Sequence, residues 1–118
     1  MKHHLKRVLN GKEEDYIRTI YLHDRNIGKS VSLARLSAKY DIPVVVSHYS
    51  WKRLIENDIP KTLPKYFKFN KPKAIILNEG TEGLRYTNLL MEEGFNNREI
   101  DKIKHMALKG VVGYRNYD

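Results

Sequence analysis

Apolar residues recur at three- and four-residue spacing in the first half of the chain, which is the period of an amphipathic helix. This spacing predicts three helices. The first covers 13–25, where acidic residues at its start complement the positive end of the helix dipole. The second is a short helix capped by Ser32, and the third covers 44–57 after Pro43. Predicted inward-facing residues are Tyr16, Ile17, Ile20, Tyr21, Leu33, Leu36, Tyr40, Val44, Ser47, Trp51, Leu54 and Ile55.

Two stretches after the third helix have the pattern of strands. Residues 61–70 mix aromatic residues with lysines, and 74–77 form an aliphatic run after a turn with two lysines. Two helices followed by a hairpin are typical of a winged helix-turn-helix, whose second helix enters the DNA major groove. The sequence therefore predicts a mainly α fold with a small β-hairpin. This winged domain is expected over 13–80, after a basic N-terminal arm over 1–12.

The last third of the sequence predicts two more amphipathic helices, which lie within 81–110 and end at Gly94 and Gly110. They either complete the core or pair with a second copy of the chain. We expect a homodimer, because two-fold dimers bind paired DNA half-sites, and a monomer is the alternative. Residues 111–118 are predicted to be a loosely held tail.

Positive charge is concentrated in the first two thirds of the chain. The 118 residues include 22 Lys and Arg against 14 Asp and Glu, a net charge of +8. Up to Lys73 there are 16 basic and 7 acidic residues, and from Ala74 onward there are 6 and 7. Such an excess indicates a polyanionic partner, with nucleic acid first and an anionic membrane surface second.

The chain contains no cysteine, which excludes disulfides, thiolate zinc sites and cysteine nucleophiles. This composition fits the cytosol. The longest aliphatic runs, 44–46 and 74–77, are far shorter than the ~20 apolar residues of a membrane span. The basic N-terminus is followed by no apolar stretch, so no signal peptide is expected. We therefore expect a soluble cytoplasmic protein with no membrane partner.

Two short segments resemble the N-terminal domain of the iron- and manganese-dependent repressors. They read Glu-Asp-Tyr-Ile at 14–17 and Val-Ser-Leu-Ala at 31–34, and the resemblance covers roughly residues 14–84. It implies a winged DNA-binding domain in a transcriptional repressor. That family binds metal partly through a carboxylate pair in the first helix, where Asp15 matches the first acid and Arg18 replaces the second. Because a guanidinium cannot ligate a cation, no metal or other cofactor is predicted.

The exposed face of the predicted helix over 44–57 supplies the candidate DNA contacts. Polar side chains read base edges, and apolar groups contact thymine methyls. A solvated helix face is the alternative interpretation. The predicted base-reading residues are Val45, His48 and Tyr49. Phosphate contacts are expected from Lys52, Arg53, Lys65, Lys68, Lys71 and Lys73. The rings that can either stack on unpaired bases or pack on the core are Tyr66, Phe67 and Phe69.

No catalytic set stands out in the sequence. There is no glycine-rich phosphate loop, no His-Glu-x-x-His and no nucleophile elbow, so no enzyme is predicted. The predicted function is sequence-specific binding of double-stranded DNA, as a transcriptional repressor that uses the helix over 44–57 and a wing over 61–77. One alternative is a plasmid or phage protein that marks a replication or partition site. Another is a winged domain that binds proteins.

Overall fold

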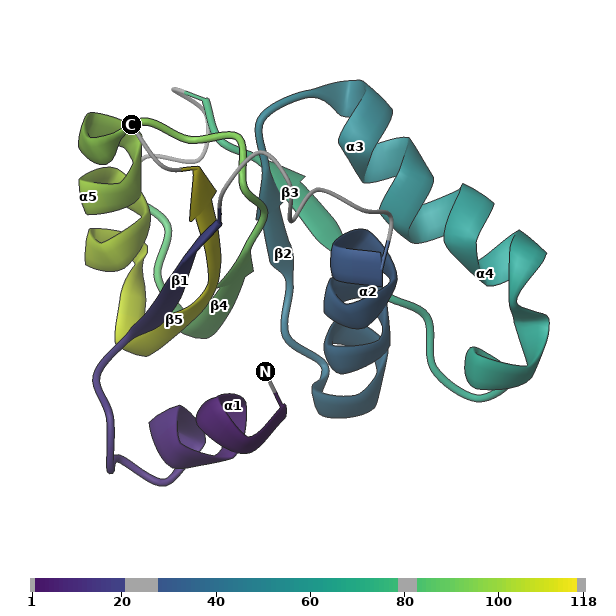
Figure 1. Ribbon diagram of the computed structural model, residues 1–118, viewed down its shortest axis with the longest axis horizontal. Helices are drawn as coiled ribbons and strands as arrows, with labels where there is room; N and C mark the ends of the chain where they lie inside the picture. The colour runs from purple at the N-terminus through teal and green to yellow at the C-terminus, as the bar shows by residue number, and fades with distance from the viewer. Residues whose placement is uncertain (1, 21–27, 79–82, 117–118) are drawn as a thin grey trace.

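A five-stranded sheet in which every strand is parallel to its neighbours organises the chain (Figure 1). The computed structural model describes residues 2–20, 28–78 and 83–116. The strand order across the sheet is β1-β5-β4-β2-β3. The strands are β1 (Tyr16–Ile20), β2 (Val44–Val46), β3 (Ala74–Ile76), β4 (Tyr86–Met91) and β5 (Ala107–Asn116).

Helices cover both faces of this sheet. The helix α5 (Asn97–Met106) packs alone on one face. On the other face lie α1 (Lys2–Leu9), α2 (Gly28–Tyr40) and a longer helix. That longer helix runs from α3 (Tyr49–Arg53) through a π-helical segment (Leu54–Asp58) into α4 (Ile59–Thr62), and a 3₁₀ turn follows (Pro64–Tyr66).

Successive residues of the central strands point into different cores. Val44 and Val46 join the core beneath α1 and α2, whereas Val45 between them joins the core beneath α5. Leu90 and Met91 divide in the same way. A parallel strand buried on both faces is a continuous apolar run, so its sequence lacks the alternation of a half-exposed strand.

The prediction of a mainly α winged helix-turn-helix is wrong, because the chain forms an α/β fold. Residues 16–20 are the strand β1 where a helix was predicted, and 44–46 are the strand β2 where the reading helix was expected to begin. The apolar spacing of both segments fits either structure. Burial on both faces of a sheet favours the strand, since branched valines pack well there.

The predicted wing is also wrong. Residues 61–70 contain the end of α4, the 3₁₀ turn and irregular backbone, and β3 pairs in parallel with β2. The N-terminal arm is instead the helix α1, whose Leu5 and Val8 are fully buried.

The last third of the chain differs most from its prediction. The expected fourth helix is replaced by β4, and its predicted start at 79–82 lies outside the described residues, as does the predicted end of the first helix within 21–27. The expected loose tail continues β5, which lies between β1 and β4. Residues in the last third that were predicted to form a helix and a tail therefore form the strands β4 and β5 of the sheet.

Two helices and one strand match their predictions. The predicted short helix after Ser32 lies within α2, but α2 begins at Gly28, so the predicted cap at Ser32 is wrong. The predicted helix through Ile100 and Ile103 is α5, which ends at Met106 and not at Gly110. Asn96 caps α5, and Glu99 completes a capping box. The predicted strand over 74–77 contains β3.

Among the helices of residues 2–20, 28–78 and 83–116, none has the length and apolar character needed to cross a membrane.

Candidate functional site

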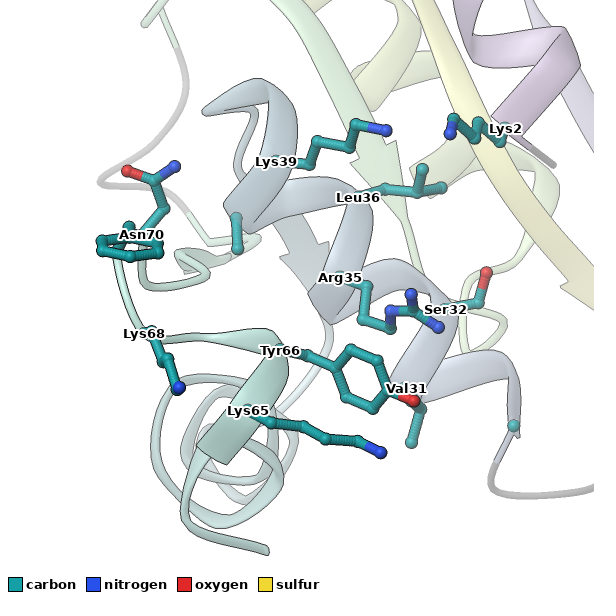
Figure 2. Close-up of a pocket in the computed structure, with 13 residues that line it drawn as sticks. Lys2, Val31, Ser32, Arg35, Leu36, Lys39, Lys65, Tyr66, Lys68 and Asn70 are labelled. Carbon is teal, nitrogen blue, oxygen red and sulfur yellow. The ribbon is translucent and has the colours of Figure 1, made fainter. Parts of the chain in front are cut away.

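A basic groove follows the outer side of α2 (Figure 2). It has a volume of about 510 Å³, and it lies between the start of α1, the length of α2 and the segment 65–70. We call it the α2 groove. Among the described residues, its lining contains five cations and no carboxylate. The five cations are Lys2, Arg35, Lys39, Lys65 and Lys68.

The sequence of α2 explains why cations line the groove. Leu33 and Ala34 are buried against the sheet, whereas Arg35 and Lys39 are exposed one turn apart. Residues four apart share a helix face, so both positive side chains extend into the same groove.

The segment 65–70 forms the opposite wall. Phe67 is buried in the core and anchors the segment, while its neighbours Tyr66 and Phe69 are exposed. The Phe69 side chain is 94% exposed, so burial does not account for this large apolar ring. A ring left exposed beside cations is available to stack on a planar partner.

Tyr66 lies between two cations. The Arg35 guanidinium is 4.1 Å from the centre of the Tyr66 ring, and the Lys65 ammonium is 5.0 Å from it. Both contacts are cation–π interactions, which hold the two charges at the groove.

Lys2 and Lys39 converge where α1 begins and α2 ends. Hydrogen-bond contact with Lys39 and the positive charge of Lys39 lower the pKa of Lys2. Lys39 also lies 5.6 Å from the centre of the Tyr40 ring. The buried Tyr40 hydroxyl has no hydrogen-bond partner among the described residues. Two ammonium groups held this close would be stabilised by an anion between them.

The structure separates the three residues predicted to read bases. Val45 is fully buried in β2, so its predicted base contact is wrong. His48 caps the start of α3, and Tyr49 is the first residue of that helix. Both are exposed, and neither lines the α2 groove.

Lys52, predicted to bind phosphate, stabilises the edge of the sheet. Its ammonium donates hydrogen bonds to Glu56 at 3.3 Å and to the carbonyl of Ala74 at 2.6 Å. Glu56 in turn accepts from the amide of Ala74 at 2.9 Å. Both backbone polar groups of Ala74, the first residue of the edge strand β3, are thereby hydrogen-bonded. Arg53 is exposed on α3 and does not line the groove.

The remaining predicted phosphate contacts divide into two groups. Lys65 and Lys68 line the α2 groove. Lys71 lines a separate open pocket beside α4, and the exposed Lys73 is 3.1 Å from the Asp41 carboxylate. Two of the four lysines thus line the α2 groove, and Lys68 also lines the pocket of Lys71.

Sequence reasoning placed Lys2 in a basic N-terminal arm and missed the two cations that α2 contributes to the groove. Their signal was the pair Arg35 and Lys39, four residues apart on the polar face of a predicted helix. It also missed Gly28, Lys29 and Ser30, which form the first turn of α2. These are the last three residues of the phosphate-binding motif G-x-x-x-x-G-K-[ST], whose first glycine is replaced by His23.

A second group of polar residues lies where β2 and β4 end. These two strands are neighbours in the sheet. The chain continues from β2 to β3 on one side of the pair and from β4 to β5 on the other side. Such a switch point is where open parallel sheets commonly bind ligands. The Glu92 carboxylate accepts hydrogen bonds there from the Ser47 amide at 2.8 Å and the Ser47 hydroxyl at 2.7 Å. Burial raises the pKa of Glu92, and the bonds from Ser47 oppose that shift.

The described residues contain no group of three His, Asp or Glu side chains placed to hold a metal ion. Asp15, which resembles a repressor ligand, accepts a hydrogen bond from the amide of Val111 at 2.8 Å. This bond connects the entry of β1 to β5.

Comparisons with known proteins give no match to a family model, to a curated protein or to a solved structure. The resemblance to metal-dependent repressors stays a prediction from short segments, and the winged fold that it implied is wrong. The functional argument therefore rests on the charges and rings of the α2 groove.

Proposed function

We propose that the chain binds single-stranded nucleic acid in the α2 groove. The observation that carries the proposal is the lining itself, in which five cations and two exposed aromatic rings occur with no carboxylate among the residues that the structure describes. Proteins that bind single strands combine a positive groove along the phosphates with rings that stack on unpaired bases.

A single strand fits this surface better than a duplex does. Reading a major groove requires a protruding helix or a two-stranded ribbon. Here the basic face of α2 is recessed, with the segment 65–70 on one side and Lys2 on the other (Figure 2). Double-stranded DNA, the partner predicted from the sequence, is therefore a competing ligand in the test.

The test is fluorescence anisotropy with a short labelled oligothymidine, titrated at several salt concentrations. We expect Lys65→Ala/Lys68→Ala to weaken binding and to lower the slope of log affinity against log salt by about 1.4, at roughly 0.7 per lost phosphate contact. The matched control is Arg98→Ala/Lys104→Ala, which removes two exposed charges from α5 on the other face of the sheet. This control should keep more of the affinity and of the slope.

Two results would contradict the proposal. Equal loss in both double variants would indicate attraction by net charge alone. Tighter binding to a duplex of the same length, or to anionic vesicles, would assign the groove to a different partner.

A second candidate function is binding of a nucleoside triphosphate at the start of α2. The observation that favours it is Gly28-Lys29-Ser30, which opens a 13-residue helix after the parallel strand β1. In proteins with the complete motif, the start of a helix that follows a strand places backbone amides and a lysine around nucleotide phosphates. Gly28 also lines the α2 groove, so the two candidate ligands would meet adjacent surfaces.

Isothermal titration with ATP and GTP in the presence of Mg²⁺ tests this candidate. We expect Lys29→Ala to abolish measurable binding, because the lysine of the motif contacts the phosphates. Lys104→Ala should leave it unchanged. Absence of binding to the unmodified chain would reject the nucleotide candidate and leave the single-strand proposal standing.

A further inference from the structure

The two sides of the α2 groove differ in chemistry. In Figure 2, Lys2 and Asn70 lie on opposite sides of the view, with Lys39 between them. The Lys2 side carries closely spaced positive charge. The Asn70 side carries the exposed ring of Phe69, the residue before it in the chain.

The side near Lys2 has the donors that a phosphate needs. Lys2 and Lys39 both line the groove there, and Figure 2 shows their side chains directed toward each other. The proximity of Lys39 is the main cause of the lowered pKa of Lys2. A phosphate oxygen accepts hydrogen bonds from ammonium groups and supplies the missing negative charge.

The side near Asn70 has a free aromatic face. Tyr66 is already in contact with Arg35 at 4.1 Å and with Lys65 at 5.0 Å, so its ring positions cations. Phe69 is the more exposed of the two rings, at 94% against 43% for Tyr66. A base can therefore stack on Phe69 without displacing a cation.

We propose, on the basis of the single-strand function above, that a nucleic-acid strand crosses α2 with a phosphate between Lys2 and Lys39 and an unpaired base on Phe69. This assigns different roles to the two aromatic residues. Phe69 stacks on the base, and Tyr66 is a positioning residue for Arg35.

The test compares oligothymidine with an abasic strand that has the same number of phosphates. Phe69→Ala should weaken binding of oligothymidine by about tenfold, which is typical for loss of one stacked base. It should change binding of the abasic strand by less than about twofold, because that strand has no base to lose. Tyr49→Ala removes another exposed aromatic ring, on α3 outside the groove, and should change neither affinity.

The lysine pair should behave in the opposite way. Lys2→Ala/Lys39→Ala should weaken binding of both strands by the same factor and lower both salt slopes by about 0.7, because the two lysines contact one phosphate. Phe69→Ala should leave both salt slopes unchanged. Oligouridine in place of oligothymidine distinguishes RNA from DNA as the tighter ligand.

The outcomes separate this inference from the function on which it depends. If the unmodified chain binds neither strand, the proposed function fails. If it binds oligothymidine but Phe69→Ala weakens both strands equally, or neither, the stacking role of Phe69 is rejected while the groove remains. If Lys2→Ala/Lys39→Ala leaves both slopes unchanged, the phosphate does not lie between these lysines.

Discussion

Glu92 shows how one residue connects two elements at the end of the sheet. Its side chain is only 5% exposed, yet both hydrogen bonds that it accepts come from the first residue after β2. Gly94 leaves room for these hydrogen-bonded groups. A Cβ at this position would lie 3.1 Å from both the Glu92 carboxylate and the Ser47 hydroxyl. The bonds fix the position from which α3 begins.

Because burial raises the pKa of Glu92, this residue predicts a pH dependence of stability. The folded state holds the Glu92 proton more tightly than the unfolded state, whose carboxyl titrates near about 4.3. The contribution of Glu92 to the free energy of unfolding is therefore greatest at low pH, and it is lost as pH rises through the raised pKa. Glu92→Gln cannot ionise but keeps an accepting oxygen. The free energy of unfolding of the unmodified chain minus that of Glu92→Gln should fall as pH rises from about 4.

Urea denaturation of both proteins across this pH range measures the difference. Glu14→Gln, which changes an exposed acid, is the control and should show no such trend. A difference that stays constant with pH would mean that Glu92 titrates alike in the folded and unfolded states.

At the residue scale, the sequence predicted that the lysines near 65–73 would be exposed, but it could not predict what each of them contacts. Exposure follows from a charged side chain alone, because burying an unpaired ammonium is costly. Partners depend on the fold: Lys68 lines the groove, whereas Lys73 pairs with Asp41. Val45 was misplaced because its burial depends on a strand that the sequence did not distinguish from a helix.

At the scale of elements, α2 and α5 were predictable and β1, β2 and β4 were not. The two helices have local signals: buried residues on one side of α2, and the capping box at Asn96 that starts α5. The three strands owe their conformation to partners that are distant in the sequence. In β1, for example, Tyr16 pairs with Val112 of β5. Segments of three to six residues leave too few positions to tell a period of 2 from one of 3.6.

The junction between β1 and β5 requires a glycine at position 110. A Cβ at Gly110 would overlap the carbonyl oxygen of Glu14 and would crowd Val8 of α1. We expect Gly110→Ala to lower the free energy of unfolding by about 1–3 kcal/mol, the usual cost of overpacking. Chemical denaturation monitored by circular dichroism measures this change.

Leu108→Ala is the control in the same strand, since its side chain is 73% exposed. It should change stability by less than about 0.5 kcal/mol. Equal stability of Gly110→Ala and the unmodified chain would show that the backbone of Glu14 does not approach β5 this closely.

At the scale of the whole molecule, pairings between distant segments hold the sheet together. β1 pairs only with β5 among the described strands, although α2, β2, β3 and β4 separate them along the chain. A winged helix-turn-helix forms from neighbouring segments, so local patterns favoured it. Parallel pairing leaves no local signal of which strands will meet, because the connections between partners are long.

The position of β5 between β1 and β4 also bears on how the chain folds as a ribosome makes it. At about 5–20 residues per second, the roughly ninety residues from the end of β1 to the start of β5 take several seconds to synthesise. Throughout that time, the nascent chain contains the segment 16–20 without β5, its one partner among the described strands. An unpaired strand is a template for aggregation, so the emerging chain needs protection until β5 leaves the exit tunnel. Slower translation would prolong this interval, and a chaperone that covers residues 16–20 would shorten the exposure.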